Sequence, residues 1–411
     1  MKIGIVGSGV SGLMCAYLLG RNHDVTVFES QNRFGGHINT VECADGEKTV
    51  HVDTGFIVHN EQNYPLFSKL LRTIGSETQD SDMSFSVRHD PSRTEFSGRN
   101  LDTLFTSRRN LVSPDHWSMI RDIRRFFDVA SNRVERGQSV ADFLAQHGFG
   151  KPFWERFLCP LCCSLWSCPP SLAAEFPISY VAGFLKNHGM LTLKGRPTWK
   201  VVVGGSNSYL ERLLKHIQAR TNSGCPVNSI KRLEGAVQIS TPVGNHDFDE
   251  VIVACHADEA LALLQTPNSR ESALLSSFQF QSNDVVLHTD ISVLPKNPKA
   301  WASWNYRVPT TDQASSTVTY NMNMLQKLTS KTTFLVSLNE PNIEPSKVIK
   351  HIHYAHPVGA AAAEVARDQR TALVRNDRIS YCGAYWGYGF HEDGVRSAVE
   401  VAQAFGERFD A

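Results

Sequence analysis

The chain has 411 residues, and its 41 Lys and Arg balance its 41 Asp and Glu, so its formal net charge is zero. A neutral chain lacks the attraction that drives non-specific binding to nucleic acid, so we expect no nucleic-acid partner. The 41% hydrophobic and 20% charged residues exclude a disordered chain. No apolar run approaches the roughly 20 residues of a membrane-spanning helix. The nine cysteines, an odd number, argue against a complete disulfide framework and predict a cytoplasmic protein.

The beginning of the chain has the pattern of a βαβ unit. Residues 2–6 form a short apolar run typical of a strand, and a glycine-rich turn and a helix follow. Residues 24–28 form a second such run, which ends at Glu29. This order of elements predicts the opening of a parallel sheet.

The elements predicted downstream follow one another without a repeat or a low-complexity linker. Helices are expected at residues 64–74, 116–136, 140–146, 153–166, 180–187, 209–219 and 395–409. Strands are expected at residues 83–88, 94–96, 201–203, 226–233, 237–241, 250–255, 285–289, 318–323, 334–338, 348–354 and 379–382. The length of the chain fits roughly two or three domains. Because nucleotide-binding character appears at the start, near the middle and at the end, we expect two domains that are interleaved in sequence.

The turn after the first strand reads Gly7-x-Gly9-x-x-Gly12. The first glycine permits a tight turn, the second lets the backbone approach a diphosphate, and the third lets helix and strand pack closely. The phosphates would sit on free N–H groups at the helix N-terminus. Glu29 follows Gly12 by 17 residues, near the spacing of an acid that binds a ribose hydroxyl. The context favours dinucleotide binding over a structural glycine turn.

Two further stretches favour FAD over NAD as the dinucleotide. The pair Gly35 and Gly36, between Arg33 and His37, would bring backbone N–H groups to the same diphosphate, although a plain loop is the alternative. Residues 381–394 lead from a strand through a glycine-rich turn to the final helix, with its N-terminus expected at Gly394. A positive helix end suits the isoalloxazine, whose reduced form carries negative charge at the N1–C2=O edge.

The sequence resembles the FAD-dependent amine oxidase and phytoene desaturase superfamily, and within it a bacterial branch of predicted NAD/FAD-binding, amine-oxidase-like proteins. The matching stretches span nearly the whole chain: GSGVSGLMCAYLL, ESQNRFGGHINTV, VDTGFIVHNEQNYP, NHGMLTLKGRPTWKVVVGGSNSYLERL, DEVIVACHADEALALL, AWASWNY and YCGAYWGYGFHEDGVRSAVEVA.

The resemblance implies an α/β fold in which a Rossmann-like FAD-binding domain of the GR2 type is interleaved with an α+β substrate-binding domain. The FAD-binding domain is expected at residues 1–62, 198–266 and 376–411, and the substrate-binding domain at 63–197 and 267–375. The resemblance also implies non-covalent FAD. Together with the motifs it gives these cofactor contacts: Gly7, Gly9, Ser11, Gly12, Glu29, Ser30, Arg33, Gly35, Gly36, His37, Gly55, Phe56, Val227, Gly383, Asp393, Gly394 and Val395.

The chain departs from the amine oxidase pattern at two catalytic positions. The family lysine that holds a water at flavin N5 has no counterpart here, and Asn283 takes its place in the matching strand. The final tyrosine of the family's aromatic cage is matched by His391, which could act as acid, base or substrate anchor, or simply pack the turn. The substrate pocket is expected to include Tyr388, Phe390, Trp166 and Trp199.

Cysteine and histidine clusters invite a metal hypothesis, which we do not favour. Cys159 and Cys162 have ligand spacing, with Cys163 and Cys168 nearby, but the run is apolar and buried thiols behave as small hydrophobes. We therefore expect protein core or pocket lining. His351, His353 and His356 lie close in sequence, yet alternation along a strand separates them. No metal is expected.

Residues 108–136 carry seven arginines and four acids with interleaved aromatic side chains. The segment is either a solvated helix with one core face or a surface that meets lipid headgroups. The second interpretation predicts peripheral contact at the inner membrane face.

The leading functional hypothesis is an FAD-dependent oxidoreductase that desaturates or isomerises an acyl, lipid-type substrate by hydride transfer to flavin N5, with His391 moving the proton. Relatives of the branch are associated with cyclopropane-fatty-acid synthase-type enzymes, which suggests a lipid methyltransferase partner. The alternatives are an oxygen-using amine oxidase, a non-catalytic flavin-binding partner of such a methyltransferase, and an NAD-dependent dehydrogenase.

Overall fold

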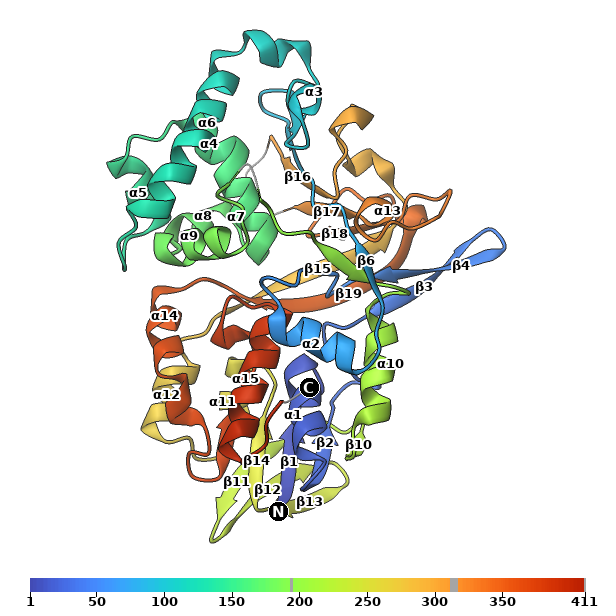
Figure 1. Ribbon diagram of the computed structural model, residues 1–411, viewed down its shortest axis with the longest axis vertical. Coiled ribbons are helices and arrows are strands. Elements are labelled where there is room, and N and C mark those ends of the chain that lie inside the picture. The colour runs from blue at the N-terminus through green and yellow to red at the C-terminus, as the bar shows by residue number, and fades with distance from the viewer. Residues whose placement is uncertain (193–194, 311–316, 410–411) are drawn as a thin grey trace.

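Five parallel strands drawn from distant parts of the chain form the central sheet of one half of the molecule (Figure 1). The computed structural model describes residues 1–192, 195–310 and 317–409. The strand order is β10 (Arg220–Asn222), β2 (Asp24–Phe28), β1 (Lys2–Val6), β14 (Glu250–Val253) and β20 (Ile379–Tyr381). The predicted βαβ unit and α/β fold class are thereby confirmed.

Both faces of this sheet are covered at its centre, which explains why the central strands β1 and β14 are mainly apolar, whereas the edge strand β10 is polar and exposed. Ile3 and Ile5 of β1 face the helices, where α1 (Val10–Leu19) is buried along its whole length. A three-stranded antiparallel sheet covers the other face, so close that a Cβ on Gly4 would lie 2.7 Å from Cδ1 of Ile239. The helices packed with α1 are α2 (Pro65–Thr73), α10 (Ser206–His216) and α15 (His391–Ala404). The covering strands are β11 (Ser229–Leu233), β12 (Ala236–Thr241) and β13 (Gly244–Phe248).

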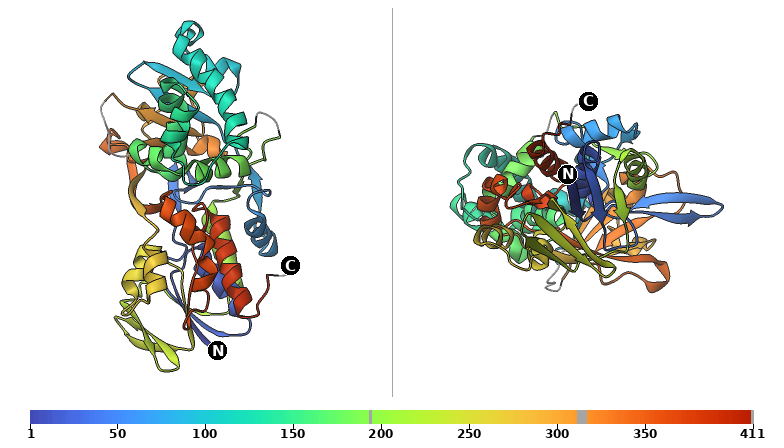
Figure 2. Two further views of the ribbon diagram at one scale, coloured as in Figure 1. Left: turned by 90° about the vertical axis from the view of Figure 1, so that its left-hand side faces the viewer. Right: turned by 90° about the horizontal axis from the view of Figure 1, so that it is seen from below.

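A seven-stranded sheet forms the centre of the other half, at the opposite end of the long axis (Figure 2). Neighbouring strands in this sheet are antiparallel, except for the parallel pair β16 and β7. In spatial order its strands are β19 (Val348–Pro357), β15 (Phe280–His288), β18 (Leu335–Leu338), β17 (Val318–Asn321), β16 (Trp304–Val308), β7 (Phe85–His89) and β8 (Thr94–Ser97).

Helices cover one face of the seven-stranded sheet and build the largest apolar core. They are α4 (Pro114–Asn132), α5 (Val140–Gln146), α6 (Lys151–Phe153), a π-helical turn η2 (Trp154–Leu158), α7 (Cys159–Trp166), α8 (Pro170–Glu175) and α9 (Ile178–Asn187). The short helix α3 (Leu101–Leu104) and the turn η1 (Arg108–Val112) precede them in the chain. Ser139 caps the N-terminus of α5, because its Oγ accepts the N–H of Asp142 at 3.0 Å.

Two small sheets lie where the halves meet. They are the ribbon of β3 (Thr40–Asp45) and β4 (Lys48–Asp53), and the trio β5 (Val58–His59), β9 (Lys200–Val202) and β6 (Thr78–Asp80). The remaining helices are α11 (Ala257–Leu263), α12 (Ser269–Leu275), α13 (Met322–Leu325), α14 (Ala361–Asp368) and the short turns η3 (Ile291–Val293), η4 (Pro298–Ala300), η5 (Pro345–Lys347), η6 (Arg370–Leu373) and η7 (Ala384–Trp386).

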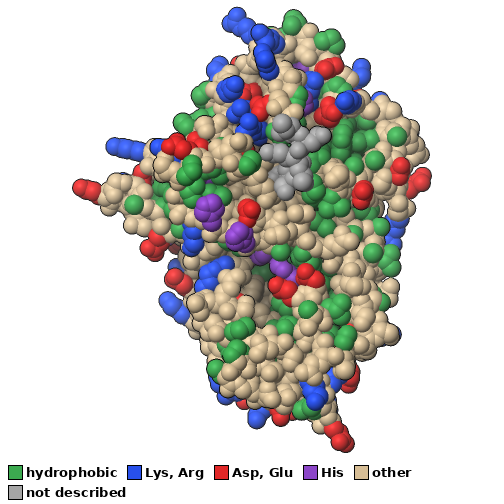
Figure 3. Space-filling model, turned by 180° about the vertical axis from the view of Figure 1, so that it is seen from behind, with side chains coloured by type: hydrophobic (Ala, Val, Ile, Leu, Met, Phe, Trp, Pro, Cys, Tyr) green, Lys and Arg blue, Asp and Glu red, His purple; other side chains and the backbone are tan. Residues whose placement is uncertain are grey.

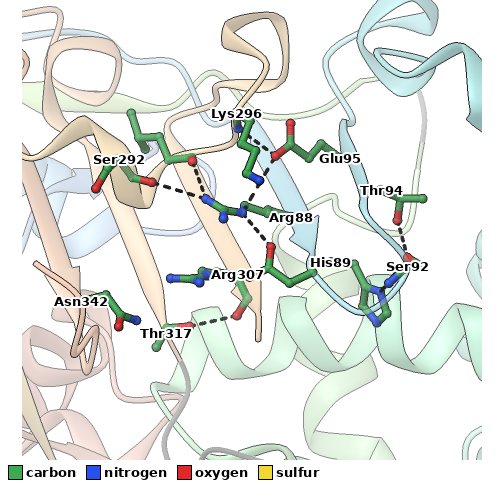
Figure 4. A network of polar contacts seen from close by, with 12 residues as sticks. Arg88, His89, Ser92, Thr94, Glu95, Ser292, Lys296, Arg307, Thr317 and Asn342 are labelled. Carbon is green, nitrogen blue, oxygen red and sulfur yellow. Dashed lines mark hydrogen bonds and ion pairs between the residues drawn. The ribbon is translucent and has the colours of Figure 1, made fainter. Parts of the chain in front are cut away.

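A polar network ties the parallel pair β7 and β16 to the loop before β16 (Figure 4). Arg88 Nε and Arg307 Nε each donate to one carboxylate oxygen of Asp90 at 2.8 Å. Arg88 also donates to the backbone oxygen of Leu294 at 3.1 Å. The Asp90–Arg307 ion pair and the hydrogen bond from Arg88 to Leu294 connect segments more than 200 positions apart and tie β7 to β16 and to the loop before it.

The predicted bounds of the final helix are wrong at both ends. It begins at His391, four residues before the predicted start, and ends at Ala404 instead of residue 409. The Asp393 carboxylate accepts the N–H groups of Phe390 and Tyr388 at 3.1 and 3.0 Å, so the helix is capped earlier. Gly394 and Val395 thus lie inside the first turn.

The parallel sheet takes its strands from the three stretches assigned to FAD binding, but the boundaries stay predictions. Helix α2, beyond the predicted boundary at residue 62, packs with the FAD-binding half through Phe67 and Leu70. Helices α12 and α14, inside the predicted substrate segment 267–375, also pack on that half.

Candidate functional site

A cavity of about 910 Å³ extends from the glycine-rich turn after β1 to the seven-stranded sheet. Its position is set by topology, because it starts at the carboxyl ends of the parallel strands β1, β2 and β14, where ligands of open α/β sheets bind. Figure 3 shows histidine side chains gathered at a hollow in the middle of one face, and His256, His353 and His356 line the cavity.

The turn between β1 and α1 is closely packed on its protein side and open on its cavity side. Gly7 has a φ of +100°, and a Cβ on Gly12 would lie 2.0 Å from the oxygen of Gly7. A Cβ on Gly9 would meet no atom within 4 Å, so this glycine faces open cavity. No side chain caps the N-terminus of α1, so its first N–H groups are available to an anion.

The second glycine pair packs against the first turn. Gly35 N donates to the oxygen of Ser8 at 3.0 Å, and a Cβ on Gly36 would lie 3.3 Å from Cα of Gly9. The Arg33 guanidinium shapes the loop by donating to backbone oxygens of Gly36 and Ile38 at 2.7 and 3.0 Å. Two facing glycine turns form a cradle that any side chain would fill, and this fits a diphosphate.

Glu29 stands at the end of β2, 8% exposed, on the wall of the cavity. Its carboxylate accepts the N–H and the hydroxyl of Ser8 at 3.0 and 2.6 Å, and the N–H of Gln31 at 2.8 Å. The acid is thus fixed beside the turn, where a ribose would lie. Val227 lines the same end of the cavity.

Most predicted site residues line this cavity. They are Gly7, Gly9, Ser11, Glu29, Ser30, Arg33, Gly35, Gly36, His37, Gly55, Phe56, Val227, Gly383, Trp166, Trp199, Tyr388, Phe390 and His391. Five do not line it: Gly12, Asn283, Asp393, Gly394 and Val395. Gly394 supports the site from behind, since a Cβ there would meet Ser11 Oγ at 2.8 Å, and this lets α15 approach the glycine turn.

His391 is held firmly in the cavity wall. Its ring stacks on Phe56 with centroids 3.6 Å apart, and its Nε2 lies 3.0 Å from the hydroxyl of Tyr209. Burial, and then the neighbouring His59, lowers the pKa of His391 to about 3. The imidazole is therefore neutral at neutral pH.

Asn283 lies on β15 with its side chain 1% exposed and turned into a polar network. Its Nδ2 lies 3.3 Å from Nδ1 of His356, and its Oδ1 accepts from Asn339 Nδ2 at 2.7 Å. The predicted catalytic role stays a prediction. The contacts show Asn283 holding His356, which does line the cavity.

The chain matches the model of the flavin containing amine oxidoreductases over residues 10–405. It belongs to the flavin containing amine oxidoreductase family. FAD is therefore its cofactor, as the glycine cradle fits, and membership makes it an FAD-dependent oxidoreductase by class.

Three solved structures have a similar fold, and the similarity covers 98% of this chain and 98% of each of those chains. They are a putative protoporphyrinogen oxidase from Exiguobacterium sp. 255-15 (14% identity, TM-score 0.69), a CLA-producing fatty acid isomerase from P. acnes (13%, 0.68) and a cyclohexylamine oxidase from Brevibacterium oxydans IH-35A (12%, 0.67). An uncharacterized protein of Methanocaldococcus jannaschii is 23% identical over 257 residues, which span 61% of this chain and 58% of that protein.

Three histidines meet beside the cavity, of which only His37 was predicted as a site residue. His37 stacks on Tyr354 at 4.6 Å, and its ring centroid lies 5.3 Å from His356 and 6.2 Å from His256. Burial lowers the pKa of His356 to about 4 and that of His37 well below 6.5. His356 was considered only as a metal ligand. His59 was not predicted as a site residue, and it is buried with neither ring nitrogen hydrogen-bonded among the described residues.

The cysteine cluster on α7 and just after it is fully enclosed. Cys159, Cys162, Cys163 and Cys168 are at most 5% exposed and unpaired, in the apolar core of the helical layer. Their neighbours Leu161, Leu165 and Trp166 line the cavity. In the described part of the chain, no cluster of three or more His, Cys, Asp or Glu could hold a metal ion.

Proposed function

We propose that the chain desaturates an acyl, lipid-type substrate or isomerises a double bond in it, using FAD. The observation that carries this proposal is the apolar end of the cavity. Its wall is made by Met83, Phe85, Leu161, Leu165, Val285 and Leu338. Burying a hydrocarbon chain against such side chains is favourable by about 25 cal/mol per Å².

Charge is confined to the nucleotide end of the cavity. Among the described lining residues, three carry an Asp, Glu, Lys or Arg side chain: Glu29, Arg33 and Glu259. All three lie by the parallel sheet. An uncharged hydrocarbon segment therefore meets no desolvated charge at the apolar end. One solved structure of similar fold carries the name of a fatty acid isomerase, which is consistent with this substrate class.

FAD, when bound, supplies a ring system that accepts a hydride from carbon and, in an isomerisation, returns it. The chain supplies the shape of the site and a proton acceptor. The apolar wall aligns the hydrocarbon and excludes water, and His391, fixed by Phe56 and Tyr209, offers a neutral imidazole that can take a proton transiently.

The test is anaerobic spectroscopy of the FAD-loaded protein with extracted phospholipids, free unsaturated fatty acids and a panel of amines. Bleaching of the flavin by an acyl substrate, or a shifted double bond in the product, supports the proposal. An isomerase turns over many times without oxygen, whereas a desaturase stops after one turnover unless an oxidant is added. If amines alone reduce the flavin, the acyl hypothesis is wrong.

An oxygen-using amine oxidase is the second candidate, and the aromatic side chains beside His391 favour it. Phe184 stacks on Phe390 with centroids 5.0 Å apart and lies 5.5 Å from Tyr388. Aromatic faces attract ammonium groups. This function predicts release of hydrogen peroxide with a primary or secondary amine in air.

A further inference from the structure

Helix α3, the turn η1 and the start of α4 lie at one end of the molecule (Figure 1), and they carry exposed apolar side chains. Leu101 is 77% exposed, Leu111 51%, Val112 82% and Trp117 50%. We call these four residues the tip patch. The other exposed large hydrophobic side chains of the described residues are scattered singly over the chain: Met1, Val203, Leu233, Val243, Ile291, Ile349 and Val365.

Arginines surround the tip patch. Arg108 and Arg109 precede Leu111 on η1, and Arg121 and Arg124 follow Trp117 on the exposed side of α4. Figure 3 shows Lys and Arg side chains beside hydrophobic ones at this end of the molecule.

The acidic side chains in this region do not cancel that charge. Asp122 is 1% exposed, and Asp115 pairs with Arg156 at 3.0 Å. Asp102 pairs with Lys299 at 3.5 Å. Arg121 shares the buried Asp122 at 3.8 Å, so the positive charge at the rim of the tip patch comes from Arg108, Arg109 and Arg124, although the chain as a whole is neutral.

The exposed side chains are held in place. Trp117 Nε1 donates to the backbone oxygen of Leu111 at 2.8 Å, and its ring lies 5.2 Å from that of Phe105. The indole is thereby fixed beside η1 with half of its surface open to solvent. A rigid, half-exposed tryptophan next to aliphatic side chains is typical of the interfacial region of membranes.

The tip patch also lies over the apolar end of the cavity. Beneath it, Leu104, Ile120 and Ile123 pack in one apolar cluster with Phe85. Phe85 is at the same time a lining residue of the cavity. A continuous apolar layer therefore separates the cavity from the tip patch.

We propose that the tip patch docks on the surface of an anionic lipid bilayer. The aliphatic side chains and Trp117 would enter the boundary between headgroups and acyl chains, and the surrounding arginines would bind acidic headgroups. Among the described residues no helix is long and apolar enough to cross a membrane, so this contact is interfacial. The proposal concerns binding and stands independently of the reaction.

The experiment is co-sedimentation of the FAD-loaded protein with vesicles of phosphatidylcholine, pure or mixed equally with phosphatidylglycerol. Binding is expected only to the mixed vesicles. The double variant Arg108→Gln/Arg109→Gln should lower the partition coefficient about thirtyfold, and Leu111→Ser/Val112→Ser about tenfold or more. The matched controls are Lys231→Gln/Arg270→Gln and Val243→Ser/Val365→Ser, exposed pairs on the other half, which should bind as the parent does.

A second measurement locates the contact. Lipids with brominated acyl chains should quench part of the tryptophan fluorescence, and Trp117→Phe should abolish that quenching. Absence of binding to the mixed vesicles overturns the proposal, as does equal loss in the control variants. So does a dimer, seen by sedimentation velocity, that Leu111→Ser/Val112→Ser dissociates, because the tip patch would then join two copies of the chain.

Discussion

His391 stacks on Phe56 with the ring centroids 3.6 Å apart and the planes 15° from parallel, although 335 positions separate them in sequence. The contact joins the loop after β4 to the first residue of α15, and both side chains line the cavity. Since a stacked ring cannot rotate freely, His391 presents one fixed edge to the site.

Replacing His391 should separate its two roles. His391→Gln retains a hydrogen-bonding group for Tyr209 but cannot bind a proton, and we expect flavin reduction about a hundredfold slower, as for loss of a general base. Bound FAD, measured by absorbance, should be unchanged. Tyr209→Phe removes only the hydroxyl that pairs with His391, and it should slow flavin reduction less than His391→Gln does. A His391→Ala variant with full turnover and full FAD would exclude any catalytic role.

The pH profile of flavin reduction should lack a limb near 6.5. The pKa values of His391 and His356 are lowered to about 3 and 4 by burial, so both rings are neutral from about pH 5 to pH 8. Activity that depends on a neutral His391 stays constant over this range and falls only under more acidic conditions. The measurement is the rate constant of anaerobic reduction against pH. A limb near 6.5 that His391→Gln removes would contradict the burial argument.

The glycine cradle can be tested with a methyl group. Gly9→Ala adds a Cβ that meets no protein atom, so the fold should keep its stability while FAD affinity drops about tenfold or more, because the methyl occupies space for the diphosphate. Gly98→Ala is the matched control, since its Cβ also meets no atom and the residue does not line the cavity. Titration of the apoprotein with FAD measures the affinity of each variant for the cofactor. Equal affinities for the two variants would place the diphosphate elsewhere.

Local signals made the nucleotide-binding end predictable. The glycine turn, its flanking strands and Glu29 lie within one short stretch, so spacing alone indicated their geometry. The polar strand β13 has no apolar alternation and forms only because it pairs with β12, and it was not predicted. The placement of Asn283 depends on the register of β15 with β19, where it pairs with Tyr354. No pattern along a single segment reports such a register, nor the meeting of His37, His256 and His356 from three segments.

Filling the apolar end of the cavity should distinguish acyl from amine substrates. Leu165→Phe adds volume to the wall at α7, so turnover of a long acyl chain should fall about tenfold while FAD binding is retained. Leu172→Phe on α8 is the control, a half-buried leucine in the same core that does not line the cavity. The ratio of kcat/KM for long and short substrates measures the effect. A small amine should be oxidised equally well by both variants.

Asp53 at the end of β4 should make stability depend on pH. Its fully buried carboxylate accepts the hydroxyl of Thr40 at 2.6 Å and the N–H of Ser206, at the N-terminus of α10, at 2.8 Å. Burial nevertheless raises its pKa from 3.8 to about 6. The folded state therefore binds this proton more tightly than the unfolded chain, and the stabilisation is complete below pH 3.8 and lost as pH rises through about 6. The difference corresponds to about 3 kcal/mol.

The Asp53→Asn variant isolates this contribution from that of the buried histidines, which act in the opposite direction on acidification. The amide does not titrate, so the loss in melting temperature relative to the parent should be larger at pH 4 than at pH 7. Thermal unfolding of the FAD-loaded protein at both pH values measures it, with the exposed Asp142→Asn as control. A difference that stays constant with pH would show that the Asp53 carboxylate is already ionised throughout. In that case the hydrogen bonds from Thr40 and Ser206 outweigh the cost of burying its charge.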